Sequence, residues 1–135
     1  MNELALAPFQ YNKDQETRDS MLSFNWGEKD GTYRKFSNLD ISTLKQLVAQ
    51  KFADPDEQQN DAPTIAEFVE FMEKYPNMKA HGYVTGHPRS DYRLSIEGIE
   101  GQIINYENMR DFISVFRIAD EFEINENGYC RCWYD

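Results

Sequence analysis

The central part of the chain, residues 80–104, has the clearest alternation of apolar and polar positions. Within it, residues 90–97 follow the two-residue period of a β-strand. The apolar positions are Tyr92, Leu94 and Ile96, and the polar ones are Asp91, Arg93, Ser95 and Glu97. We expect three antiparallel strands in a row over residues 80–104, with Gly98 and Gly101 between strands. Such a sheet has one apolar face, and amphipathic helices before and after it can cover that face.

Two segments before this stretch have the spacing of amphipathic helices. Asp40 is a good N-cap for a helix over residues 41–53. Thr64 and Glu67 form a capping box that begins a second helix, and Pro76 ends it. The expected buried positions are Leu44, Leu47, Val48 and Phe52 in the first helix and Ile65, Phe68, Val69 and Met72 in the second.

The last third of the chain predicts a helix followed by a hairpin. Asn105 can cap a helix over residues 106–118, whose expected buried face is Met109, Phe112, Ile113 and Phe116. Strands over residues 121–124 and 129–133 flank the turn Asn125-Glu126-Asn127-Gly128. Asn-Gly is among the strongest short hairpin signals, so we expect the chain to end in a β-hairpin.

The segments between these elements are polar or rich in turn residues. Residues 20–36 predict another hairpin, with its turn at residues 27–31, and a helix over residues 14–24 is the alternative. Residues 54–63 contain two prolines and no large apolar side chain, which predicts an exposed loop.

Together these elements predict an α+β fold in which an antiparallel sheet of about five strands, built from a meander and hairpins, packs with three helices. The 135 residues fit a single globular domain, 1–135, that buries roughly two-thirds of its unfolded surface. Nine Phe, eight Tyr and two Trp supply the apolar volume for a core.

Charge narrows the range of partners. Twenty-four acidic and fourteen basic residues give a formal net charge of -10. A field of this sign repels phosphate backbones, so we expect no nucleic-acid binding. It attracts a basic protein partner, although an acidic surface also serves plain solubility.

The two cysteines and the hydropathy of the chain indicate the cellular compartment in which the protein is found. Cys130 and Cys132 lie two residues apart on one predicted strand, so both face the same side with poor geometry for a mutual disulfide. Free thiols in a reducing cytoplasm are expected. No apolar run reaches about 18 residues and no targeting segment is visible, so we expect no membrane span and a cytoplasmic location.

Few residues suggest catalysis. His81 and His87 are the only histidines, and neither they nor the two cysteines have a recognised metal-ligand spacing, so no metal site and no cofactor are expected. No nucleophile elbow or glycine-rich phosphate loop is present. Catalytic residues therefore stay unassigned.

Tyr129, Arg131 and Trp133 form the best binding candidate. On a regular strand these three line up on the face opposite the cysteines. An arginine between two large aromatic residues is typical of binding hot spots. The alternative is a strand packed beneath a helix, with the arginine stem as filler.

Three classes of function follow. The first is a small acidic binding protein, such as an inhibitor, an immunity-like protein or an accessory subunit, that contacts a basic protein. The second is a module that binds a small ligand in a pocket between sheet and helices. An enzyme of unassigned class ranks last, because no reactive group has a supporting pattern.

Overall fold

The computed structural model describes residues 8–25, 32–87 and 89–135. In this part of the chain, six strands form one antiparallel sheet in the order β1-β2-β3-β4-β6-β5. The elements are α1 (Gln15–Ser20), β1 (Ser23–Phe24), β2 (Tyr33–Leu39), α2 (Ile41–Ala49), α3 (Ile65–Lys74), β3 (Lys79–Thr85), β4 (Leu94–Gln102), α4 (Tyr106–Phe116), β5 (Glu121–Ile124) and β6 (Tyr129–Trp133). The predicted α+β class is confirmed, with six strands where about five were expected. No helix in the described residues is long and apolar enough to cross a membrane.

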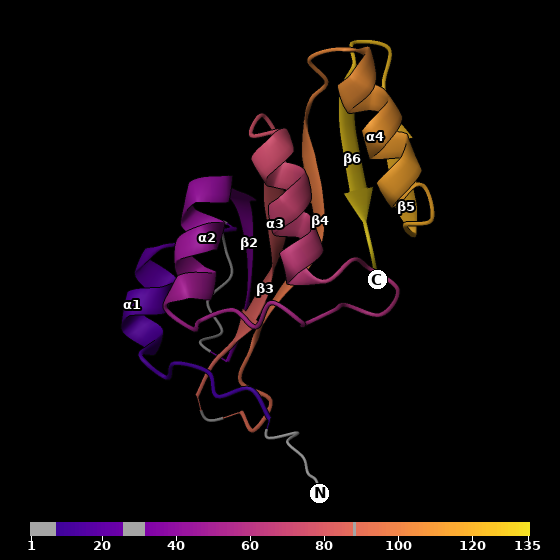
Figure 1. Cartoon of the computed structure of the whole chain (residues 1–135). Helices are drawn as coiled ribbons and strands as arrows, with labels where there is room; N and C mark the ends of the chain where they lie inside the picture. Colours follow the sequence, from indigo (N-terminus) through magenta and orange to yellow (C-terminus); the bar gives the residue numbers. More distant parts are fainter. Residues whose placement is uncertain (1–7, 26–31, 88) are drawn as a thin grey trace, which may run out of the picture.

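Three helices lie side by side along one face of the sheet, in the order α2, α3, α4 (Figure 1). All three predicted N-caps are confirmed: the side chains of Asp40, Thr64 and Asn105 each accept a hydrogen bond from a backbone N–H in the first turn. Thr64 and Glu67 make both bonds of the predicted capping box. α2 ends at Ala49 rather than at residue 53, because its last carbonyls bond the backbone N–H groups of a turn that follows.

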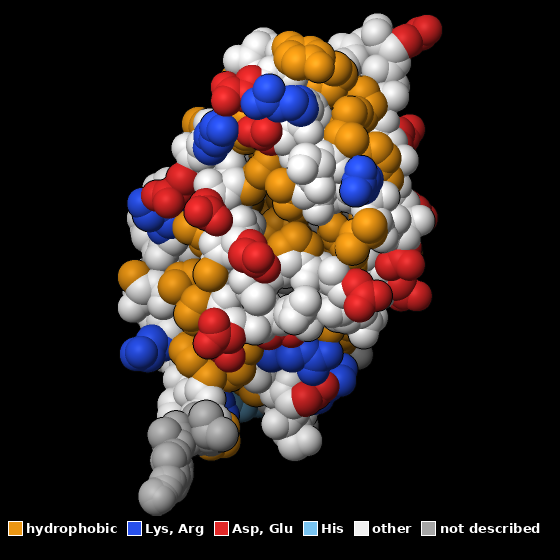
Figure 2. Space-filling model, turned by 45° about the vertical axis from the view of Figure 1, so that its right-hand side comes forward, with side chains coloured by type: hydrophobic (Ala, Val, Ile, Leu, Met, Phe, Trp, Pro, Cys, Tyr) orange, Lys and Arg blue, Asp and Glu red, His pale blue; other side chains and the backbone are white. Residues whose placement is uncertain are grey.

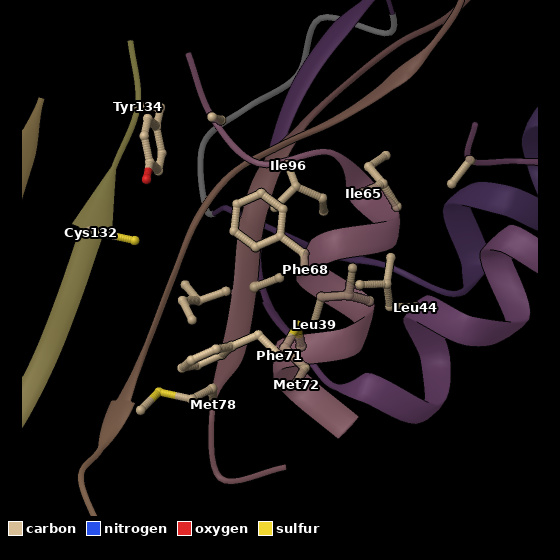
Figure 3. Close-up of a cluster of buried hydrophobic side chains, with 14 of the residues drawn as sticks. Leu39, Leu44, Ile65, Phe68, Phe71, Met72, Met78, Ile96, Cys132 and Tyr134 are labelled. Atoms are coloured by element: carbon tan, nitrogen blue, oxygen red, sulfur yellow. The ribbon is translucent and has the colours of Figure 1, made fainter. Parts of the chain in front are cut away.

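The core fills the space between these helices and the sheet (Figure 3). Phe68 of α3 is fully buried and stacks on Phe116 of α4, with ring centroids 5.7 Å apart. From the sheet side, Ile96 of β4 and Cys132 of β6 enter the same core. Cys130 is also buried, and both cysteines are free thiols, as the sequence predicted.

The orientation of α4 differs from the prediction. Ile113, expected in the core, is 36% exposed, and Asn108 is buried in its place. The Asn108 carboxamide oxygen accepts hydrogen bonds from Ile104 N at 3.1 Å and from Asn77 Nδ2 at 3.0 Å. These bonds tie the start of α4 to neighbouring loops and turn Ile113 outward. Figure 2 shows hydrophobic side chains gathered on the upper part of the surface, where α4 lies.

Residues 80–104 contain two strands, β3 and β4, and not the three that were predicted. β4 runs through both Gly98 and Gly101 without a turn. The pairing shifts by one residue at the centre, where His81 faces Gly98 but Gly82 faces Ile96, so Glu97 is the extra residue of a β-bulge. Gly98, which suggested the end of a strand, therefore lies beside an irregularity within one strand.

The hairpins agree better with the prediction. β5 and β6 have the predicted bounds, and Gly128 has a φ of 82°, which a glycine adopts without strain. At the other edge, β1 pairs with β2 through Ser23↔Ser37 and Phe24↔Phe36, which confirms the hairpin. Its predicted turn at residues 27–31 lies outside the described residues.

Candidate functional site

The two faces of β6 have opposite characters. Cys130 and Cys132 point into the core beneath the helices, so the alternate residues Tyr129, Arg131 and Trp133 lie on the other face of the sheet. This is the predicted alignment. None of the described helices covers that face (Figure 1). Tyr129 is 39% exposed, and Arg131 and Trp133 are half-buried, so these three side chains do not pack beneath a helix.

Carboxylates surround the three residues. Glu100 of β4 and Glu123 of β5 pair directly with Arg131, and Glu121 pairs with Trp133. Directly opposed residues of antiparallel strands share one face of the sheet. We call these six residues the acidic aromatic face: Tyr129, Arg131, Trp133, Glu100, Glu121 and Glu123. Its three carboxylates and one guanidinium give a net charge of -2.

Internal contacts fix the side chains of this face. Arg131 Nη1 lies 2.6 Å from Glu121 Oε1, and its Nε lies 3.9 Å from Glu100 Oε1. The Tyr129 hydroxyl donates to Glu100 Oε2 at 3.0 Å. Burial, followed by the bond to Glu100, raises the pKa of Tyr129 to about 12. Because exposed ion pairs add little stability, the main effect of these contacts is to orient the side chains.

A hollow of about 210 Å³ adjoins the acidic aromatic face. Strands β2, β3, β4 and β6 all contribute to its walls, so it forms only in the folded sheet. Its lining includes the charged or titratable residues Lys35, His81, Glu97, Glu100 and Arg131, together with Trp133. The hollow and the acidic aromatic face share Glu100, Arg131 and Trp133, which makes them one continuous surface.

Glu97 is the most buried charge of the hollow, and the β-bulge of β4 places it there. Its side chain is only 8% exposed. Lys35 Nζ lies 3.5 Å from Glu97 Oε1, and the Trp133 indole, which lines the same hollow, lowers the pKa of the carboxylate. Burial raises the pKa of Glu97, and these two partners offset part of that effect.

His81 is held by a bond that spans two strand spacings. Its Nε2 lies 3.2 Å from the backbone carbonyl oxygen of Cys132. A carbonyl oxygen only accepts, so Nε2 carries the hydrogen in this bond. Burial lowers the pKa of His81, which favours the neutral ring. Gly98 makes the reach possible, because a Cβ there would lie 2.9 Å from His81 Cε1.

The sequence pointed to three residues of this surface. It predicted Tyr129, Arg131 and Trp133, but it assigned no role to Lys35 and weighed His81 and Glu97 only as possible metal ligands. A glutamate followed by glycine inside a strand pattern was the available signal, because it indicates a bulge. In the described residues, no group of three or more His, Cys, Asp or Glu side chains is placed to hold a metal ion.

Comparisons with protein-family models, with curated proteins and with solved structures found no match for this chain. Its function is therefore inferred from the chemistry of its own side chains.

Proposed function

We propose that the protein acts by binding a basic protein through the acidic aromatic face. The observation that carries this proposal is the sheet face that the described helices leave uncovered, where Tyr129, Arg131 and Trp133 stand among three carboxylates. Aromatic residues and arginine are the commonest anchors of protein interfaces. Their contacts with Glu100 and Glu121 hold them in place before a partner arrives, which lowers the entropy cost of binding.

The charge of the surface supports a basic partner. The acidic aromatic face has a net charge of -2, and the whole chain has a formal net charge of -10. Both therefore favour approach of a positive protein surface and oppose approach of nucleic acid. An inhibitor, an immunity-like protein or an accessory subunit would use such a surface.

We place this activity in the cytoplasm, with the chain acting as one domain. Two free thiols support a reducing compartment. One core cluster that extends from Phe36 to Tyr134 supports a single folding unit.

Affinity capture tests the proposal. The immobilised protein is exposed to extract of its native host beside two variants, Trp133→Ala on the acidic aromatic face and Tyr106→Ala on α4. Tyr106 is a matched control because it is an exposed aromatic residue, 70% accessible, on the helical layer. We expect wild type and Tyr106→Ala to retain the same basic protein and Trp133→Ala to lose it.

The purified partner then allows a second measurement. Its affinity should fall as salt increases, because exposed charges are screened over about 10 Å at 0.1 M. Equal capture by Trp133→Ala, or an affinity that salt does not change, would contradict the proposal.

A small polar ligand is the second candidate. The hollow contains two titratable groups, Glu97 and His81, whose pKa values burial shifts in opposite directions. Such pairs occur at ligand-binding and catalytic sites. A metabolite that raises the melting temperature of wild type but not of Glu97→Gln would favour this candidate over a protein partner.

A further inference from the structure

The charges of the hollow differ in how firmly they are held. The carboxylate of Glu97 lies at depth, with 8% of its side chain exposed, on a backbone position that the bulge fixes. The two cations lie at the rim, where Lys35 is 38% and Arg131 is 34% exposed. Arg131 is held by its ion pair with Glu121, whereas the long side chain of Lys35 can shift its ammonium group toward solvent. An entering cationic group therefore meets a fixed negative charge, Glu97, behind one positive charge, Lys35, that can move aside.

Size and shape restrict the occupant further. A volume of about 210 Å³ is below the range of roughly 300–1,000 Å³ typical of drug-sized ligands. It suits one extended side chain. Trp133 forms one wall of the hollow, beside the Glu97 carboxylate, whose pKa it lowers.

We infer that the hollow receives one arginine side chain of the basic partner. The inference rests on the proposed function, which it makes more specific. The guanidinium stacks on Trp133 and donates two parallel hydrogen bonds to the Glu97 carboxylate, while Lys35 moves aside toward solvent. Arginine fits better than lysine because only the planar guanidinium makes both the stacking and the paired contact.

The stability of the free protein supports this role for Glu97. A carboxyl group whose pKa is raised in the folded state stabilises the fold only while it is protonated, and this contribution is lost as pH rises through the folded pKa. At neutral pH, the ionised Glu97 carboxylate therefore stabilises the fold less than its protonated form would. A binding role accounts for a charge that folding disfavours.

The test uses the capped peptide acetyl-Gly-Arg-Gly-amide. Its control replaces arginine by citrulline, which has the same shape without the charge. Binding is followed at pH 7.5 by the NMR signal of the Trp133 indole N–H, assigned by comparison with Trp133→Phe, because Trp133 lines the hollow. We expect the arginine peptide to saturate the protein with a dissociation constant in the millimolar range. The citrulline peptide should bind at least about tenfold more weakly.

Three variants give the sharpest comparison. Glu97→Gln should weaken binding of the arginine peptide about tenfold or more. Glu70→Gln, which removes an exposed charge from α3, should leave the affinity for this peptide unchanged. Lys35→Met removes the internal cation that competes for Glu97 and should strengthen binding several-fold. A gain of affinity is a result that misfolding does not produce.

Several outcomes would overturn the inference. They are the absence of saturation by the arginine peptide, equal binding of the citrulline peptide, unchanged affinity in Glu97→Gln, or saturation by phosphate or acetate in place of the peptide. Failure of the proposed function is visible separately in the capture experiment. If Trp133→Ala loses the partner while Glu97→Gln keeps it, the face binds without the arginine contact; if both keep it, the proposed function fails.

Discussion

The imidazole of His81 on β3 reaches past Gly98 of β4 and hydrogen-bonds the backbone carbonyl of Cys132 on β6, with 3.2 Å between Nε2 and the oxygen. One side chain thereby connects β3, one of the two central strands, to β6, the strand that contributes Tyr129, Arg131 and Trp133. The contact depends on a missing side chain, because a Cβ at residue 98 would lie 2.0 Å from the Cys132 oxygen.

Replacing this glycine should be costly. Gly98→Ala forces the backbone of β6 away from β4, and we expect the free energy of unfolding to fall by about 3 kcal/mol. Urea denaturation measures the change. Ser114→Ala, at an exposed position of α4, is the control and should change stability by less than about 0.5 kcal/mol. Equal stability of the two variants would show that the approach of the two strands is looser than described.

Phe68 should be one of the main residues of the core. Its side chain is 0% exposed and stacks on Phe116, so Phe68→Ala should lower the free energy of unfolding by about 3–5 kcal/mol through lost contacts and the cavity that remains. Val115→Ala on α4 is the comparison, because Val115 is 43% exposed. A denaturation midpoint that Phe68→Ala leaves unchanged would contradict the packing of α3 on the sheet.

His81 should make stability depend on pH. Burial lowers its pKa in the folded protein, as do the nearby Arg131 and Lys35, while Glu100 and the bond to Cys132 oppose the shift. The unfolded chain therefore binds a proton below about pH 6.5 that the folded protein excludes, and stability falls as pH drops below that value. His81→Gln should make the melting temperature less dependent on pH between about 5 and 6.5. The same slope in both proteins would assign the effect to other groups.

The two cysteines should be unreactive in the folded protein. Both are fully buried, and burial raises the pKa of each thiol to about 12, so few thiolates exist at neutral pH. Labelling with a thiol reagent at pH 8 should be slow in buffer and fast in denaturant. A chelator and a reductant together should leave the melting temperature where it was, and a large downward shift would indicate a metal or a disulfide that supports the fold.

The sequence was sufficient to predict the features that form within one short segment of the chain. The capping box at Thr64 and Glu67, the N-cap at Asn105 and the Asn127-Gly128 turn depend on residues that are close in sequence, and the structure has all three. The alternation in β6 likewise separated the buried cysteines from Arg131, because strand geometry sends successive side chains to opposite faces.

The features that depend on contacts between residues far apart in the chain were visible only in the tertiary structure. The rotation of α4 followed in part from the bond between Asn108 and the distant side chain of Asn77, which the apolar stripe of α4 alone did not reveal. The hollow needs Lys35, His81, Glu97 and Trp133 from four strands, and the order in which those strands pair appears only when the sheet forms. The sequence by itself therefore determined the three longer helices with their caps, the C-terminal hairpin and the two faces of β6. Strand pairing and the bulge at Glu97 decided which charges meet, because those contacts are made between strands and not within them.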